Sequence, residues 1–414
     1  MNLQLVQAVI ATFREADPRS HIRRLSGFRY RSWVGIYGWL DASGLALYFL
    51  ARVRELGVEA AIPVRVLQRL EENATDNKKK TASMLREFMM LNNDFKNAGM
   101  LYANLKGFTL TPDSCADIAL RCQLDLDFLM SSKDALRCES ILAERGYSLV
   151  STGAGSKEFK ADSEQLPSVR DLYKTKPQRS VEVHFVDCDG PDSFLSENEL
   201  SRLQLKIWKG SELSVLSDLD KFLGHARHLF KHLKSEWTRT SWLLEYANFI
   251  RFHQENHELW FEVRKHLIQD PKTKVAVGAV TLFAERSFGL FSLPETLKWS
   301  VRELPAPVRL WVERYGNNVL VAKYPGTKLY LLLLRAMSHD EAETLQEIRN
   351  KVFPIHRPPK VTVANQKISF TLQLNQLWNQ FSFFFFRLKF HIRQGVSYRI
   401  EAARWKQCSA SLEM

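Results

Sequence analysis

The stretch Leu124-Asp125-Leu126-Asp127-Phe128-Leu129-Met130 alternates acidic and apolar side chains and then becomes entirely apolar. Side chains at positions i and i+2 of a β-strand point to the same face of the sheet. Asp125 and Asp127 would therefore share one face, while Leu124, Leu126 and Phe128 would enter the core. The stretch predicts a strand that presents two carboxylates side by side.

Two neighbouring carboxylates need a nearby cation. Their repulsion raises the pKa of one of them unless a positive charge is present. A divalent cation that prefers oxygen ligands meets this need, and Mg²⁺ usually binds one or two carboxylates together with substrate phosphates. Asp125 and Asp127 therefore predict a Mg²⁺ site, with Mn²⁺ as the alternative ion, and a phosphorylated substrate.

A third carboxylate follows in Val181-Glu182-Val183-His184-Phe185, where apolar residues flank Glu182 on both sides. This alternation predicts another strand with Glu182 facing away from the core. If that strand lies beside the first, the three acids converge on one site. His184 shares the face of Glu182, so it either touches the substrate or is a hydrogen-bonded structural histidine.

A glycine turn precedes the acidic strand, in Asn104-Leu105-Lys106-Gly107-Phe108-Thr109. Without a Cβ at Gly107, backbone amides can approach a phosphate closely. Lys106 would add a positive charge for the same phosphate. The turn therefore predicts a phosphate contact next to the carboxylates.

With these elements in this order, the sequence resembles the DNA-polymerase-beta-like nucleotidyltransferase superfamily, and within it the branch of uncharacterised nucleotidyltransferases. The motifs that carry the resemblance are Leu105-Lys106-Gly107, Arg121, Asp125-Leu126-Asp127, Gly146-Tyr147 and Val181-Glu182-Val183-His184. They lie within residues 101–187. His228 and His232, followed by Trp242 and Glu245, are similar to a helical segment of the same branch, in which the acid is more often Asp.

The resemblance implies an enzyme that moves a nucleoside monophosphate from an NTP, with ATP as the expected nucleotide, to an acceptor and releases pyrophosphate. Asp125 and Asp127 would hold two metal ions, Glu182 would supply the third carboxylate, and Lys106 with Gly107 would lie against the triphosphate. The residues leave the acceptor open among a protein, a tRNA and a small molecule. Many superfamily members have Gly-Ser at the phosphate turn, whereas this sequence has Gly107-Phe108.

Two further residues carry alternative interpretations. Arg121 is either a functional cation or part of a surface ion pair. His228 lies four residues before His232 and hence on the same face of a helix, where it either contacts nucleotide or packs against a neighbouring helix.

The pattern along the chain predicts an α+β protein with a small mixed sheet and large helical regions at both ends. We expect a helical region over residues 1–100, a catalytic core over 101–190 and a mainly helical region over 191–414, which subdivides near 293–307. The expected helices cover residues 81–100, 133–145 and 217–254, and the expected strands cover 101–105, 124–130, 148–151, 157–160 and 180–185.

Bulk composition fits a folded protein, with 45% hydrophobic and 25% charged residues. The net charge of +12 favours partners that carry phosphate. It leaves two other functions open, a nucleic-acid-binding module and a catalytically silent relative that binds nucleotide or a partner. Five cysteines without a CxxC pair predict a reducing, cytoplasmic setting.

Two apolar segments bear on membrane contact. Residues 1–13 lack a basic segment before the apolar stretch, and we therefore expect a first helix instead of a signal peptide. Phe381–Phe386 is too short to span a bilayer. It is either a buried aromatic helix face or, with its basic flank, a helix that lies on a membrane surface.

Overall fold

The computed structural model describes residues 1–14, 18–153, 155–161, 172–175, 180–185, 197–289, 292–338, 341–352 and 370–410. The chain forms two compact units, each of which is described by itself. The first comprises Met1–Leu229 and Arg239–Glu303, and the second comprises Phe230–Thr238 and Leu304–Met414. The predicted boundary at residues 190 and 191 lies outside the described residues, so the three-part division stays a prediction.

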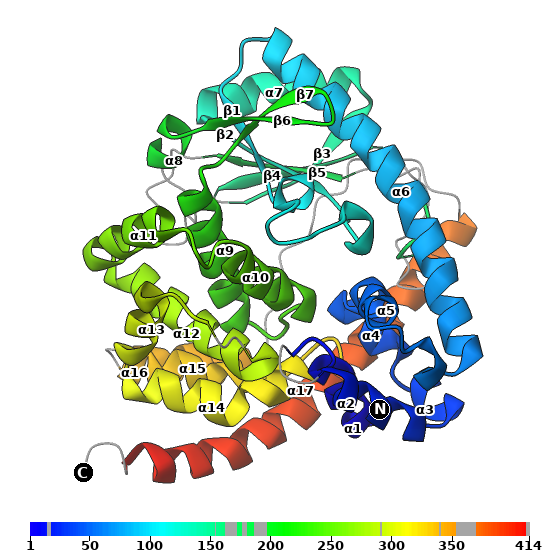
Figure 1. The fold of residues 1–414 in the computed structure, drawn as a ribbon, viewed down its shortest axis with the longest axis vertical. Coiled ribbons are helices and arrows are strands. Elements are labelled where there is room, and N and C mark those ends of the chain that lie inside the picture. The colour runs from blue at the N-terminus through cyan, green and yellow to red at the C-terminus, as the bar shows by residue number, and fades with distance from the viewer. Residues whose placement is uncertain are drawn as a thin grey trace. The chain divides into compact units, whose positions relative to one another are not determined.

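A mixed sheet of seven strands is the centre of the first unit (Figure 1). The strands are β1 (Tyr102–Leu105), β2 (Leu126–Met130), β3 (Tyr147–Thr152), β4 (Ser156–Ala161), β5 (Ser180–Phe185), β6 (Gln204–Trp208) and β7 (Ser211–Val215). Their order across the sheet is β3-β4-β5-β2-β1-β7-β6. The β2–β5 and β1–β7 pairs are parallel and the other pairs are antiparallel. The predicted α+β class with a mixed sheet is confirmed.

Helices precede the sheet in sequence, as predicted. They are α1 (Leu3–Ala11), α2 (Pro18–Arg23), α3 (Tyr30–Val34), α4 (Tyr37–Ser43), α5 (Ala46–Glu55) and α6 (Val64–Asn97), with 3₁₀ turns at Arg24–Gly27 and Glu59–Ala61. Pro63 directly precedes α6, because its fixed φ suits a helix start and its missing N–H costs no hydrogen bond there. The helix expected over residues 81–100 is the second half of α6.

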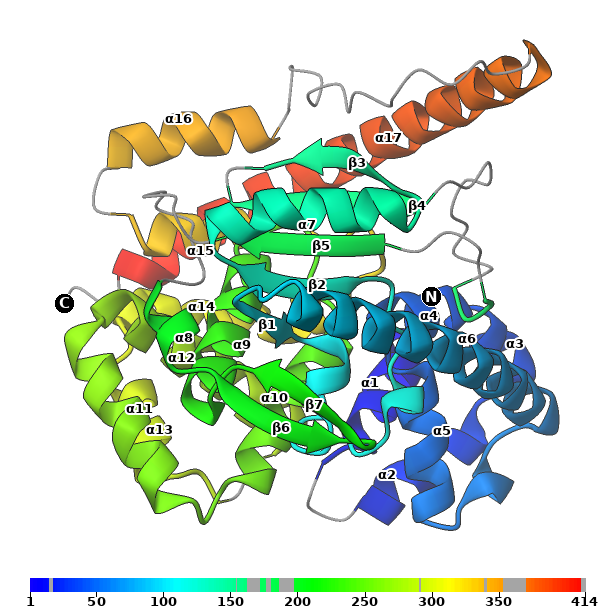
Figure 2. The ribbon, with the colours of Figure 1, turned by 90° about the horizontal axis from the view of Figure 1, so that it is seen from above.

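The two faces of the sheet differ. Leu126, Phe128 and Met130 pack with residues of α6 and of α7 (Ser132–Glu144) in one hydrophobic cluster. The opposite face carries Asp127 and a smaller cluster that contains Leu129. Figures 1 and 2 show α7 and the second half of α6 on the side of the sheet that carries Leu126, Phe128 and Met130. The alternation in the acidic stretch therefore places the apolar side chains in the core and Asp127 on the opposite face. The prediction that Leu124 enters the core is wrong, because Leu124 precedes the strand and is 53% exposed.

Beyond residue 190, in the region expected to be mainly helical, Gln204–Val215 forms two strands that the sequence analysis did not predict. After α8 (Glu197–Ser201), β6 and β7 form an antiparallel hairpin that extends the sheet. Lys209 and Gly210 both have positive φ, as a two-residue hairpin turn requires. Leu205 and Ile207 of β6 are 68% and 81% exposed, whereas Trp208 packs against the ring of Phe108.

The helix expected over residues 217–254 is two helices, α9 (Asp218–Leu233) and α10 (Thr240–Phe252). Between them the carbonyl oxygen of Glu236 accepts a hydrogen bond from the backbone N–H of Thr327 at 2.9 Å, within the second unit. That carbonyl makes a tertiary hydrogen bond instead of a helical one, and the helix ends before it.

The remaining helices follow to the end of the chain. In the first unit they are α11 (His257–Gln269), α12 (Pro271–Phe288) and α13 (Glu295–Arg302), and in the second α14 (Ala306–Leu320), α15 (Tyr330–Ala336), α16 (Glu341–Val352) and α17 (Phe370–Ala410). The predicted helical regions on both sides of the sheet sequence are therefore confirmed. Among the described residues, no helix combines the length and the apolar character needed to cross a membrane.

Phe128 is the residue on which the packing of β2 depends. It is fully buried and its ring contacts the rings of Phe88, Phe95 and Tyr102 at centroid distances of 6.1, 5.1 and 6.4 Å. We expect Phe128→Ala to lower the free energy of unfolding by about 3–5 kcal/mol, because it removes these contacts and leaves a cavity. Urea denaturation measures this loss. Leu124→Ala is the control, and an equal loss in both variants would contradict the assignment of Phe128 to the core.

Candidate functional site

Asp127 and Glu182 lie side by side because β2 and β5 are parallel neighbours in a register that pairs these two residues. The sequence analysis expected Glu182 to approach the aspartates only if its strand lay beside theirs, and the two strands are neighbours. His184, two residues after Glu182, points to the same face, and its Nε2 lies 3.3 Å from Asp127 Oδ1 and 3.6 Å from Glu182 Oε2. One ligand atom from each of these three residues lies within 4.8 Å of the others.

Lys106 completes the surroundings of Asp127 from the neighbouring strand. Leu105, the last residue of β1, pairs with Asp127, and the chain then turns so that Lys106 Nζ lies 3.0 Å from Asp127 Oδ1. Asp127 is 4% exposed and Lys106 is 33% exposed. The lysine therefore neutralises a buried carboxylate, while about a third of its side chain remains exposed.

Gly107 is required for a reason that the sequence did not indicate. Its φ is +47°, and a Cβ at this position would lie 2.4 Å from the amide Nε2 of Gln123. That amide donates a hydrogen bond to the carbonyl oxygen of Asp125 at 2.8 Å. The glycine lets the β1 turn pack directly against the segment that leads into β2.

Asp125 immediately precedes β2, which begins at Leu126. Burial, with the neighbouring Asp127 charge, raises the pKa of Asp125 to about 6. Asp127 responds in the opposite direction: burial acts to raise its pKa, but Lys106 and His184 outweigh burial and hold it well below its usual range. The two neighbouring aspartates therefore differ because Asp127 has a hydrogen-bonded lysine and histidine, whereas burial dominates at Asp125.

This set of side chains fits a divalent cation. Asp127 and Glu182 supply carboxylate oxygens, which Mg²⁺ and Mn²⁺ prefer, and burial together with the Asp127 charge raises the pKa of Asp125 beside them. Asp125 is close enough for its charge to act on Asp127, but it does not belong to the mutually close group of Asp127, Glu182 and His184.

Glu158 is a further acid that the sequence analysis treated only as part of a strand. It pairs with Glu182 across the antiparallel β4–β5 ladder. Its carboxylate forms an ion pair with Lys160 at 2.8 Å. Three adjacent strands thus carry an acid at corresponding positions: Asp127, Glu182 and Glu158. In the sequence, the lysines near Glu158 made this acid look like part of an ordinary charged strand.

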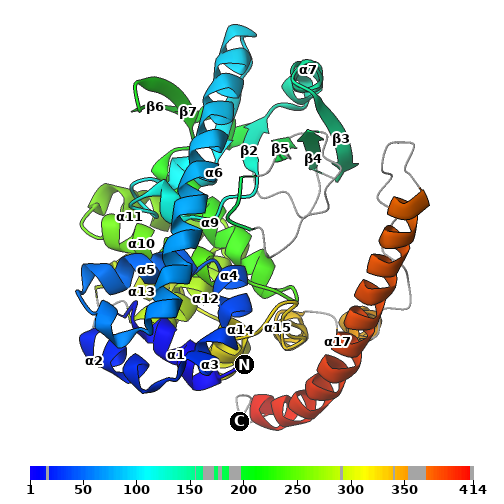
Figure 3. The same cartoon turned by 90° about the vertical axis from the view of Figure 1, so that its right-hand side faces the viewer.

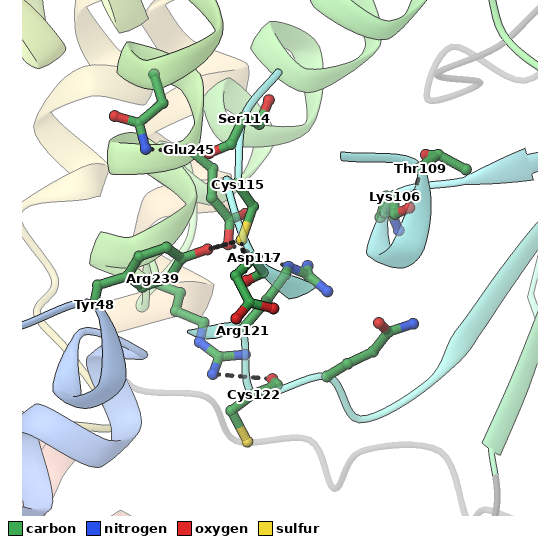
Figure 4. Close-up of polar contacts among 12 residues, drawn as sticks. Tyr48, Lys106, Thr109, Ser114, Cys115, Asp117, Arg121, Cys122, Arg239 and Glu245 are labelled. Carbon is green, nitrogen blue, oxygen red and sulfur yellow. Dashed lines mark hydrogen bonds and ion pairs between the residues drawn. The ribbon is translucent and has the colours of Figure 1, made fainter. Parts of the chain in front are cut away.

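Arg121 forms an ion pair inside the first unit and not on its surface. Its Nε donates to Glu245 Oε1 on α10 at 3.1 Å, and the two side chains are 12% and 1% exposed. The same Oε1 accepts from the hydroxyl of Tyr48 on α5 at 2.9 Å. Figure 4 shows this group, with Lys106 on the neighbouring turn. Three segments far apart in sequence therefore fix the orientation of the Arg121 guanidinium.

His228 lies on α9 with its ring 4.9 Å from the ring of Trp242 on α10. His225 lies one turn earlier on α9, and its burial, together with the charges of Arg121 and Lys106, lowers its pKa to about 3. The charges of Arg121 and Lys106 thus act on His225, and nothing in the His228–His232 spacing indicated it.

Comparison with protein-family models finds a match over more than half of the chain. The family described as uncharacterised nucleotidyltransferase matches residues 31–289, which include the sheet, Arg121 and Glu245. The chain belongs to this family. The resemblance found in the central motifs is therefore confirmed, and the family's extent adds α3–α6 and α9–α12 to the region that carries it.

No curated protein matches the chain. Among solved structures, an antigenic nucleotidyltransferase-like protein from Paracoccidioides brasiliensis is similar at 12% identity and a TM-score of 0.31. The alignment covers 48% of this chain and 92% of that one.

The opposite pKa shifts of the two aspartates predict opposite effects on stability. An unfolded Asp titrates near pH 3.9, so the raised pKa of Asp125 costs folding free energy as the pH rises from about 4 to about 6, and the cost is complete above pH 6. Without divalent cations, we expect Asp125→Asn to raise the free energy of unfolding by about 1–2 kcal/mol at neutral pH and to have little effect near pH 4.

Asp127→Asn is the matched control, because it removes the carboxylate that Lys106 and His184 stabilise, and it should lower the free energy of unfolding at neutral pH. Urea denaturation of both variants across this pH range measures the difference. A loss of stability in Asp125→Asn at neutral pH would show that the charge on Asp125 is already balanced.

Proposed function

We propose that this chain is a divalent-cation-dependent enzyme that transfers a nucleoside monophosphate from an NTP, with ATP as the expected nucleotide, to an acceptor. The observation that carries the proposal is the register of β2 and β5, which brings Asp127 beside Glu182 with Asp125 just before the strand. Family membership supports nucleotidyl transfer in general. Asp125, Asp127 and Glu182 are the residues that we assign to Mg²⁺ or Mn²⁺.

In the proposed reaction, a nucleophile on the acceptor attacks the α-phosphorus of the NTP. A bond forms between that nucleophile and phosphorus, the bond to the bridging oxygen breaks, and pyrophosphate leaves. A bound divalent cation would supply Lewis-acid stabilisation of the charge on the phosphate oxygens. The chain itself contributes mainly positioning and neutralisation of charge.

Lys106 and Gly107 are the residues that we assign to the triphosphate. Lys106 donates to Asp127, its side chain is one-third exposed, and its ammonium group has three donors. Because it lies at the end of β1, a rotation of its long side chain is enough to exchange the carboxylate for a phosphate oxygen. His184 orients Asp127 through its ring nitrogen.

The proposal also includes the cellular location of the reaction and the class of acceptor. Cys115, Cys122, Cys138 and Cys408 are free thiols, which supports a reducing, cytoplasmic location. The net charge of +12 is compatible with a tRNA acceptor as well as with an acidic protein or a small molecule.

Transfer from NTP is tested by labelling. The purified protein, each α-labelled NTP and a cell extract divided into protein, RNA and small-molecule fractions should give a labelled product that requires Mg²⁺ or Mn²⁺. We expect Asp127→Asn and Glu182→Gln each to lower the rate by about a thousandfold, since several kcal/mol of transition-state stabilisation depend on the cation.

Glu158→Gln is the matched control on the neighbouring strand, and we expect it to retain most activity because Lys160 already balances Glu158. Mg²⁺-dependent NTP binding without any transfer would instead identify a catalytically silent relative. Binding of RNA with steep salt dependence and without labelling would favour a nucleic-acid-binding module.

The Arg121–Glu245 pair generates a second kinetic prediction. Glu245 holds Nε of Arg121, and the guanidinium has two further nitrogens that can donate to phosphate. We expect Glu245→Gln to raise the KM for NTP about tenfold with a smaller change in kcat, since it weakens a charge-assisted hydrogen bond that orients Arg121.

Tyr48→Phe is the control for this pair, because it removes the other hydrogen bond to Glu245 Oε1 and leaves the ion pair in place. Its effect on KM should be smaller. Steady-state kinetics on variants with two-state unfolding measure both values. A KM that does not change in Glu245→Gln would assign the pair to folding alone.

A further inference from the structure

The final helix, α17, is held to its own unit along one side. Phe390, Tyr398 and Trp405 are buried. Lys328 Nζ lies 5.8 Å from the centroid of the Phe390 ring, and the ring of Tyr315 lies 6.0 Å from that of Trp405. Packing of this side therefore fixes which side of α17 faces outward.

Arg387 adds a polar anchor to the same side. Its Nη1 forms an ion pair with Glu236 Oε2 at 2.8 Å, and both groups belong to the second unit. Figure 2 shows the first half of α17 extending past α14, α15 and α16 of this unit, and Figure 3 shows it extending past α14 and α15. The anchored part of the helix thus supports a segment that projects beyond its neighbours.

A continuous apolar stripe occupies the outward side of α17. Its residues are spaced by three or four positions and therefore share one helix face. We call it the α17 stripe, and it consists of Trp378, Phe381, Phe385, Leu388, Ile392 and Val396, which are 75, 59, 63, 43, 51 and 54% exposed. The alternative that Phe381–Phe386 forms a buried aromatic face is wrong, because all five of its phenylalanines are at least 43% exposed.

The charges beside the stripe are all positive. Between Phe370 and Ile400 the sequence contains no Asp or Glu, whereas it contains Arg387, Lys389, Arg393 and Arg399. Glu236 balances Arg387, but Lys389 and Arg393 are exposed beside the stripe. A second copy of this helix packed on the stripe would bring these cations together, and the repulsion disfavours a helix pair of two identical chains.

We propose that the α17 stripe binds an anionic lipid surface, with the helix axis parallel to the membrane plane. The exposed phenylalanines, leucine, isoleucine and valine would enter the boundary between headgroups and acyl chains, as in amphipathic helices of peripheral proteins. Trp378 suits the same boundary because its ring is apolar and its N–H is polar. Lys389 and Arg393 would attract the anionic headgroups. The stripe extends for about 27 Å along the helix, which gives a line of contacts and not a single anchor.

Vesicle sedimentation of the full-length protein tests the proposal. Binding should be weak to phosphatidylcholine vesicles and at least about tenfold stronger when phosphatidylserine replaces about a third of the lipid, and it should fall as salt is added. Phe381→Ser/Phe385→Ser/Ile392→Ser should lower the affinity for the anionic vesicles at least about tenfold.

Two matched controls distinguish binding through the α17 stripe from non-specific hydrophobic or electrostatic binding. Phe261→Ser/Ile268→Ser removes exposed apolar side chains of α11, and Lys78→Gln/Lys79→Gln removes exposed charges of α6. Both should bind as the unaltered protein does. Lys389→Gln/Arg393→Gln changes only exposed polar positions and should lower binding and its salt dependence without affecting folding.

Three results would overturn the proposal: no sedimentation with anionic vesicles, equal affinity for neutral and anionic vesicles, or equal losses in the α17 variants and their controls. A concentration-dependent dimer that the triple serine variant abolishes, without vesicle binding, would assign the stripe to self-association instead.

Discussion

The parallel pairing of β2 with β5 is the constraint on which the candidate site depends. The pairing sets Asp127 beside Glu182, and His184 follows on the same face two residues later. A shift of this register by one residue would turn the acids of one strand toward the hydrophobic cluster under α6 and α7. Adjacent residues of β2 point to opposite faces, so the burial of Phe128 in the core and the placement of Asp127 in the site follow from one strand alternation.

The electrostatic balance around this pairing explains why the neighbouring cations lie where they do. A carboxylate as buried as Asp127 needs compensation, and Lys106 and His184 provide it through Oδ1. Asp125 keeps a raised pKa because its burial and the Asp127 charge outweigh the effect of Lys106 and Arg121. Arg121 is oriented separately by Glu245 of α10, which also accepts a hydrogen bond from Tyr48 of α5. In the sequence, α5 precedes the strands of the sheet and α10 follows them. The chain thus concentrates charge at a cost in stability, which is typical of a functional site.

Local patterns predicted the central elements because each has a strong physical signature. Acid–apolar alternation marked β2 and β5, and Gly146 marked the end of α7. The hairpin of β6 and β7 was missed, although Leu213 and Val215 of β7 are buried, because both strands are short and lie in a region that is otherwise helical. The break before α10 was missed because the hydrogen bond of Glu236 to Thr327 is not local in sequence.

The surroundings of Arg121 show the same limit of local patterns for the site. A basic residue near an acidic strand was visible in the sequence, but its ion pair joins positions 124 residues apart. His225 and Glu158 also become noticeable only when α9 and β4 are in place. Chemistry that resides in one strand or one turn could be predicted, whereas contacts that depend on packing between segments could not.

A structure with Mn²⁺ and a non-hydrolysable NTP analogue, solved with anomalous diffraction data, tests the central claim most directly. The account predicts an anomalous peak between Asp127 and Glu182, with Asp125 turned toward the ions, and a triphosphate against Lys106 and Gly107. A peak elsewhere, or nucleotide bound away from β2 and β5 with these carboxylates free of metal, would contradict it.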